Sequence, residues 1–121
     1  MKLSLETRSR GNVIIIHCQG RAVYRDEAAA LSRVVGNFMS HARKIVLDLS
    51  GVNFMDSAGI GTLALLYSSA QKEKVEFKIA GPNSFVRELL DLTKLDSVLE
   101  IHPSVNDALE AFREGGVWAD C

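Results

Sequence analysis

The sequence predicts an α/β domain with a mixed sheet of about five strands and about four helices. Runs rich in β-branched residues alternate with segments of helical periodicity, and two short strands precede this alternation. At 121 residues with 47% hydrophobic content, the chain can bury one core but is too short for two ordinary domains. We therefore predict one domain over 1–121, with a short mobile tail from about residue 115.

The first two strands are expected over 3–8 and 13–19, joined around Gly11-Asn12. Gly-Asn is a hairpin turn signal, so these strands should pair antiparallel. Gly20 is expected to end the second strand.

A helix over 25–40 follows, because its apolar side chains recur on one face. It leads to a strand over 44–49, which Ser50-Gly51 is expected to close. A strand, a crossover helix and a further strand should form a right-handed unit with parallel strands.

After the next helix, which opens near residue 57, the alternation continues to the end of the chain. Gly81-Pro82 ends a strand, Asn83 or Ser84 caps a helix, and Gly115-Gly116 stops the last helix. These last four elements are expected over 75–80, 84–92, 98–102 and from 104 onward.

Charge and hydropathy exclude several classes of function. The formal net charge is −1, with 14 basic and 15 acidic residues interspersed, so no basic face for nucleic acid is expected. No apolar run approaches the ~20 residues of a membrane span, and the N-terminal residues lack a signal-peptide core. We expect a cytoplasmic protein without membrane insertion.

The cysteines and histidines give no sign of a metal site. Cys18 lies in a strand pattern and Cys121 is the last residue, so we expect a buried apolar thiol and a mobile one. The three histidines are scattered singly, without the spacing of paired metal ligands. No metal and no cofactor is expected; the histidines are His17, His41 and His102.

One hydroxyl, one carboxylate and two glycines stand where a strand and loop give way to a helix, in Asp56-Ser57-Ala58-Gly59-Ile60-Gly61. The first amides of a helix lack acceptors, so either Asp56 or Ser57 could be the N-cap. Both positions place Ser57 within one residue of the helix start, where free amides and the helix dipole favour negative charge. A phosphate on Ser57 would be tolerated there.

The two glycines each cost about 1 kcal/mol relative to alanine inside a helix. Gly59 and Gly61 could allow close packing on a strand, could leave room for another molecule to approach Ser57, or could do both. A hydrolase nucleophile elbow would need glycine in place of Met55, and a dinucleotide fingerprint would need it in place of Ala64. Neither motif is complete.

The carboxyl ends of parallel strands carry functional groups in open α/β sheets. Ser57 follows one such strand, and the loop after the second strand should leave the sheet beside it. Arg21, Tyr24 and Arg25 are therefore candidates for a partner surface, although they could equally be ordinary solvated residues. Trp118 is expected to pack back on the domain.

These residues carry a family likeness. The stretch 56–63, with 45–52 before it, resembles the signature of the STAS domain, and the closer match is to small bacterial anti-sigma-factor antagonists. Order and length agree over nearly the whole chain, including Gly20-Arg21 and Gly81-Pro82.

The resemblance implies a partner switch without catalysis by the domain itself. An anti-sigma factor with serine kinase activity would phosphorylate the serine that matches Ser57, and a serine phosphatase would remove the phosphate. The unphosphorylated form would bind the anti-sigma factor and free the sigma factor, with no direct nucleic acid contact, as a monomer or weak dimer. Ala58 stands where many relatives carry a second Ser or Thr, so single-site modification is implied. The partner surface would comprise 56–61, Arg21, Tyr24 and Arg25.

Other classes of function remain open. A STAS subunit of a transporter-associated or stress-sensing complex would use Ser57 only as a helix cap. An enzyme finds little support, because no histidine, carboxylate pair or metal set can be placed beside Ser57 from sequence. Nucleotide binding would use the exposed amides but lacks a basic phosphate clamp.

Overall fold

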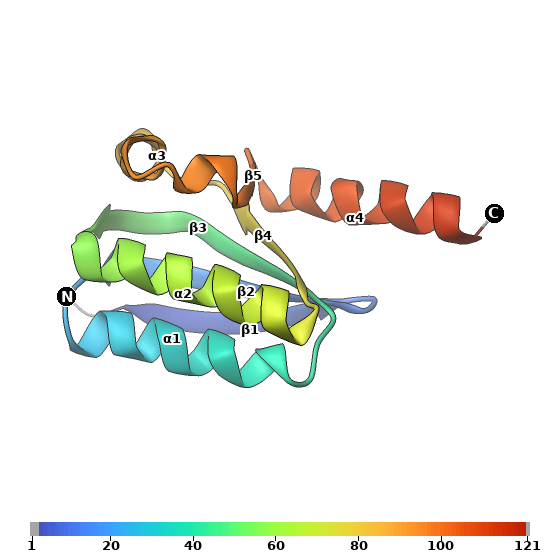
Figure 1. Ribbon diagram of the computed structural model, residues 1–121, viewed down its shortest axis with the longest axis horizontal. Coiled ribbons are helices and arrows are strands. Elements are labelled where there is room, and N and C mark those ends of the chain that lie inside the picture. The colour runs from blue at the N-terminus through green and yellow to red at the C-terminus, as the bar shows by residue number, and fades with distance from the viewer. Residues whose placement is uncertain (1–2, 121) are drawn as a thin grey trace.

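The computed structural model describes the backbone of residues 3–120 and the side chains of residues 3–113. Strands and helices alternate after an opening hairpin (Figure 1). In chain order the elements are β1 (Ser4–Arg10), β2 (Val13–Ala22), α1 (Asp26–Met39), β3 (Lys44–Met55), α2 (Ser57–Glu73), β4 (Glu76–Ala80), α3 (Ser84–Leu92), the 3₁₀ turn η1 (Leu95–Ser97), β5 (Glu100–His102) and α4 (Val105–Asp120).

The strands form one mixed sheet in the order β1-β2-β3-β4-β5. β1 pairs antiparallel with β2, and every later neighbour pairs in parallel. The hairpin closes through the Arg10 to Val13 pair, and Gly11 takes φ +61°, which glycine adopts at little cost. The predicted α/β class is confirmed.

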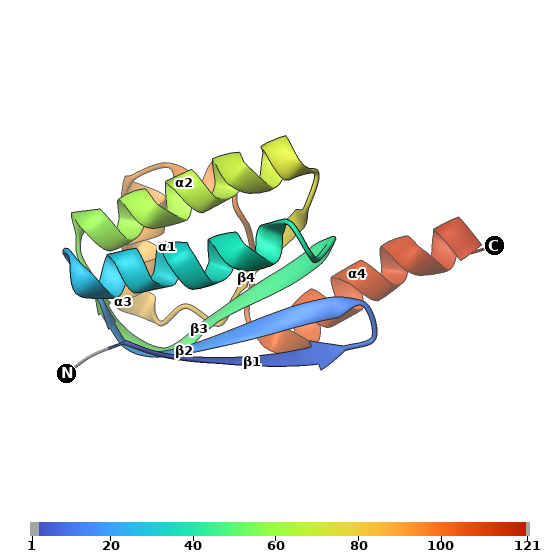
Figure 2. The same cartoon turned by 90° about the horizontal axis from the view of Figure 1, so that it is seen from below.

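Helices cover the two faces of the sheet unequally. α1 and α2 lie side by side on one face (Figure 2), where they and α3 share the main hydrophobic core with the strands. Leu31 of α1, Leu63 of α2 and Leu90 of α3 are fully buried there. On the other face, Ala108 and Phe112 of α4 pack in a smaller core, and α4 then runs away from the sheet (Figures 1 and 2).

Polar and aromatic groups dock α4 on its face of the sheet. The ammonium of Lys78, a buried residue, lies 4.5 Å from the ring centroid of Phe112 and forms an ion pair with Glu100. His102 Nε2 is 2.9 Å from the same carboxylate. Partial burial raises the pKa of Glu100, but the hydrogen bonds and charges of Lys78 and His102 outweigh this effect and hold the pKa below its ordinary value.

The two central strands are longer than predicted, because Gly20 and Gly51 lie inside them and do not end them. Gly20 takes φ +116° at a shift in the β2–β3 register. A Cβ on Gly51 would lie 2.7 Å from the carbonyl oxygen of Cys18, so glycine here permits close approach at an irregular pairing. As a result, β2 and β3 end together at Ala22 and Met55.

The last helix is also longer than predicted. The backbone of α4 continues to Asp120, so the prediction that Gly115-Gly116 stops it is wrong. A glycine ends a helix when it adopts the left-handed conformation just past the last turn; inside a helix it costs only about 1 kcal/mol. The side chain of Trp118, and Cys121, lie outside the described residues.

Candidate functional site

Ser57 is the first residue of α2, and Asp56 is its N-cap. One carboxylate oxygen of Asp56 accepts hydrogen bonds from the backbone N–H groups of Ala58 and Gly59, each at 3.1 Å. The structure therefore resolves the choice between the two capping residues in favour of Asp56. A role for Ser57 as the helix cap is wrong.

The Ser57 side chain is exposed at this helix start. Within residues 3–113, its hydroxyl has no hydrogen-bond partner. A hydroxyl without a structural hydrogen bond can be modified at little cost to the fold. The helix dipole and the free amide of the first turn favour the negative charge that a phosphate would add.

The two glycines of the motif have different surroundings. A Cβ on Gly59 would lie 2.3 Å from the carbonyl oxygen of Ala22 and 2.6 Å from Met55, so close packing on the sheet requires glycine. A Cβ on Gly61 would meet nothing within 4 Å. Close packing therefore explains Gly59, whereas internal packing does not require glycine at position 61.

The remaining motif residues divide between core and surface. Gly59 and Ile60 are buried, and the latter packs in the main core. Ala58 is half-buried, whereas Ser57 and Gly61 are exposed on one face of α2. A partner would thus meet Ser57 and Gly61 directly, and Ile60 would act by holding the helix in place.

The loop between β2 and α1 lies against the start of α2. The Asp56 N–H donates to the carbonyl oxygen of Ala22 at 3.3 Å, and the Tyr24 N–H donates to the second carboxylate oxygen of Asp56 at 3.0 Å. Tyr24 is 62% exposed, and the Arg25 guanidinium lies 5.0 Å from the centre of its ring. Arg21, the residue before the last one of β2, is exposed. The Asp56 carboxylate therefore joins the backbone of Tyr24 to the helix start that carries Ser57.

A family model for the STAS domain matches residues 4–108, which include this loop and the whole motif. The chain belongs to the STAS domain family.

Relatives of this STAS domain carry regulatory names. The anti-sigma-F factor antagonist RsfB of Mycobacterium tuberculosis is 31% identical over 91 residues, which cover 74% of each chain. The crystal structure of an anti-sigma factor antagonist from Mycobacterium paratuberculosis has a TM-score of 0.81 and 27% identity, covering 93% of this chain and 95% of that one. Two Thermotoga relatives, each 33% identical, are matched over only 62% and 59% of their own length.

SpoIIAA of Bacillus shares the fold. In its unphosphorylated form it gives a TM-score of 0.69 at 14% identity, covering 92% of this chain and 97% of that one. In its phosphorylated form it gives 0.70 at 12% identity, covering 90% and 99%. Both forms of that protein therefore share the fold of this chain.

Sequence reasoning missed an aromatic pair on this STAS domain. Phe54, near the end of β3, stacks on Phe85 of α3 with ring centroids 5.4 Å apart, and both are more than 40% exposed. Phe54 lies three residues before Ser57 in the sequence, but only the fold places Phe85 against Phe54. Exposed aromatic side chains are enriched at protein interfaces.

A second missed pair lies away from the serine. His17 Nδ1 and Asp48 Oδ2 are 2.6 Å apart, and the other oxygen of Asp48 accepts from the Ser50 N–H at 3.0 Å. These contacts satisfy a buried carboxylate between β2 and β3. Cys18 is free and buried as expected, and burial, followed by the charge of Asp48, raises its pKa to about 12. Such a thiol is protonated and inert at neutral pH.

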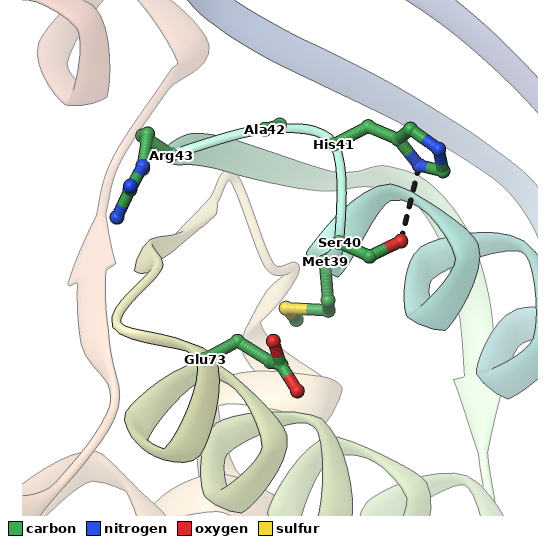
Figure 3. A pocket seen from close by; sticks show the side chains of 6 residues that line it. All are labelled: Met39, Ser40, His41, Ala42, Arg43 and Glu73. Carbon is green, nitrogen blue, oxygen red and sulfur yellow. Dashed lines mark hydrogen bonds between the residues drawn. The ribbon is translucent and has the colours of Figure 1, made fainter.

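A pocket of about 220 Å³ lies at the other ends of the helices, where α1 and α2 finish (Figure 3). The His41 ring turns toward Ser40 (Figure 3), and its Nδ1 lies 3.1 Å from the Ser40 hydroxyl oxygen and 2.9 Å from the Asn37 carbonyl oxygen, which accepts. Arg43 and Glu73 point to different parts of the pocket (Figure 3). None of the predicted site residues lines it.

The described residues contain neither a metal-binding cluster nor a membrane-spanning helix. Over residues 3–113 no three histidine, cysteine or carboxylate side chains gather in a group that could hold a metal ion. No helix in the described part of the chain has the length and apolar character needed to cross a membrane.

Proposed function

We propose that this protein is a cytoplasmic anti-sigma-factor antagonist that is switched by phosphorylation of Ser57. The unphosphorylated form binds an anti-sigma factor with serine kinase activity and so releases the sigma factor. The kinase transfers the terminal phosphoryl group of a nucleoside triphosphate to the Ser57 hydroxyl oxygen, which loses its proton as the nucleoside diphosphate leaves, and this ends the complex. A serine phosphatase hydrolyses the phosphoserine to serine and inorganic phosphate and so restores the active form. The names of RsfB and of the Mycobacterium paratuberculosis structure support this class of partner.

The observation that carries the proposal is the setting of Ser57. Its exposed hydroxyl lies at the first position of α2, has no hydrogen-bond partner among residues 3–113, and stands next to the capping carboxylate of Asp56. Phosphorylation adds about −1.5 to −2 charges and a strongly hydrated group at this point. The cap is untouched, so the helix start survives the modification.

The surface around Ser57 is suited to a protein partner. Tyr24 lies on the loop that is hydrogen-bonded to Asp56. Phe54, which stacks on Phe85, lies near the end of β3, three residues before Ser57. Exposed aromatic rings therefore lie on both of these segments near Ser57. An uncompensated phosphate charge in such an interface would cost about 3 kcal/mol, which weakens binding roughly a hundredfold.

The test is binding of the cognate anti-sigma factor to wild type, Ser57→Ala and Ser57→Asp proteins by isothermal titration calorimetry. We expect Ser57→Ala to bind like wild type and Ser57→Asp to bind at least tenfold more weakly. Ser68→Asp is the matched control, since Ser68 is an exposed serine on the same helix. Equal affinity for all four proteins would exclude a charge switch at Ser57.

A scaffold role in a transporter-associated or stress-sensing complex is the competing hypothesis. It assigned Ser57 to helix capping, and Asp56 performs that function. Mass spectrometry of protein from its native cell separates the two hypotheses, because the switch requires phosphate on Ser57 and the scaffold does not.

A further inference from the structure

The loop beside Ser57 contains a strained residue. Arg25 has φ 67° and ψ −108°, a conformation that non-glycine residues rarely adopt and that costs on the order of 1–3 kcal/mol. Hydrogen bonds on both sides hold it: the Tyr24 N–H donates to Asp56, and the Ala29 N–H donates to the Arg25 carbonyl oxygen at 2.8 Å. The fold thus fixes where the Arg25 side chain leaves the backbone.

The guanidinium of Arg25 contacts the Tyr24 ring and is exposed, so it can leave this cation–π contact for a stronger hydrogen-bonded one. It lies 5.0 Å from the ring centre of Tyr24, and both residues are exposed. Among residues 3–113 it has no hydrogen-bond or ion-pair partner. A cation–π contact at an exposed site contributes about 0.5–1 kcal/mol, whereas arginine forms stronger, two-point hydrogen bonds with phosphate.

Arg25 lies within reach of a phosphate on Ser57. The Tyr24 nitrogen and the Asp56 carboxylate are 3.0 Å apart, and Arg25 and Ser57 are the next residues of the two segments. With consecutive Cα atoms about 3.8 Å apart, this hydrogen bond limits the distance between the Cα atoms of Arg25 and Ser57 to at most about 15 Å. An extended arginine and a phosphoserine together span a comparable distance.

We propose that Arg25 binds the phosphate on Ser57 within the same molecule. The guanidinium leaves the Tyr24 ring, forms charge-assisted hydrogen bonds with the phosphate oxygens and neutralises part of the added charge. Arg21 is another basic residue at the end of β2, but it makes an interaction of its own in the structure. The off state would then differ from the on state in the shape of the loop surface as well as in charge.

This inference rests on the proposed function, which supplies the phosphate on Ser57, and adds the contact between that phosphate and Arg25. If Arg25 contributes to the anti-sigma factor complex, phosphorylation removes it from the interface by pairing it internally. One modification would therefore weaken binding twice, by adding a hydrated anion and by withdrawing a cation.

The test measures the second pKa of phosphoserine by ³¹P NMR in the full chain, with phosphoserine installed genetically at position 57. A neighbouring cation favours the dianion and lowers this pKa. We expect the pKa to be about 0.5–1 unit higher in Arg25→Gln than in wild type, as for a charge a few ångströms away in a water-like medium. Arg25→Lys should keep part of the shift, because it retains the charge without the two-point geometry.

Arg33→Gln is the matched control, since Arg33 is an exposed arginine on α1, and it should leave the phosphoserine pKa at the wild-type value. The nearby charges of Asp56, Asp26, Glu27 and Arg21 are the same in wild type and in the Arg25 and Arg33 variants, and a separate Arg21→Gln protein tests the charge of Arg21. An unchanged pKa in Arg25→Gln, or the full shift in Arg21→Gln, would overturn the assignment.

The installed phosphate separates this inference from the proposed function. The NMR experiment needs neither the kinase nor the anti-sigma factor, so a negative result refutes the Arg25 contact and leaves the switch intact. Absence of phosphate in native cells would refute the switch and leave the NMR result unaffected. Circular dichroism of each variant verifies that it is folded.

Discussion

Replacing Asp56 tests how the start of α2 is held to the loop between β2 and α1. Its carboxylate accepts three backbone hydrogen bonds, two from the first turn of α2 and one from Tyr24. Asp56→Ala loses the cap, at about 1 kcal/mol, and leaves the Tyr24 N–H without its partner, at about a further 1 kcal/mol. We expect the free energy of unfolding to fall by about 2 kcal/mol.

Asp56→Asn divides this loss into its two parts. The asparagine oxygen can still cap α2, as asparagine does at many helix starts, but its NH₂ group cannot accept from Tyr24. We therefore expect a loss of about 1 kcal/mol, half that of the alanine variant.

Urea denaturation followed by circular dichroism measures both losses, and unchanged m-values would show that the denatured state is comparable. Amide hydrogen exchange at Tyr24 should accelerate in both variants, whereas exchange at Ala58 and Gly59 should accelerate in Asp56→Ala alone. If Asp56→Ala is as stable as wild type, or if the two variants are equally destabilised, the assigned roles of the two carboxylate oxygens are incorrect.

Three further predictions concern stability. Gly59→Ala should destabilise the fold by about 1–3 kcal/mol, because its Cβ would lie 2.3 Å from the Ala22 carbonyl oxygen, and thermal unfolding measures this loss. Gly61→Ala should instead stabilise by up to about 1 kcal/mol in the same assay, since its Cβ has open space; destabilisation would show that position 61 needs glycine internally. The lowered pKa of Glu100 predicts stability that is present above the unfolded-state pKa and lost as pH falls through the folded-state pKa. Urea titrations at neutral and acidic pH should show a smaller pH dependence for Glu100→Gln, and an unchanged dependence would exclude this linkage.

Local signals predicted most elements of the fold. α3 was predicted over 84–92 and has those bounds, because Asn83 accepts from the Val86 N–H as its cap and the buried positions keep helical spacing. The ends of β2 and β3 were not predictable from such signals. A glycine in a strand pattern gives the same local signal whether it ends the strand in a turn or allows a bulge within it. Only the close approach of Gly51 to the Cys18 carbonyl oxygen, which depends on the fold, distinguishes the two cases.

At the site, too, the sequence predicted what depends on neighbouring residues and missed what depends on the fold. The helix start and the position of Ser57 followed from residue types alone. The choice of Asp56 as cap did not, since aspartate and serine cap equally well and the bond to Tyr24 comes from another part of the chain. The stacking of Phe54 on Phe85 likewise depends on how α3 docks beside β3, and no sequence spacing signals it.

The contact between Gly59 and the Ala22 carbonyl oxygen has a consequence for recognition. Because main chain lies against main chain there, the start of α2 is held to the end of β2 before a partner binds, and docking on the proposed surface would order few groups beyond the exposed side chains. Substitution of those exposed side chains would then change the affinity for the proposed partner, while the backbone contact beneath them is retained.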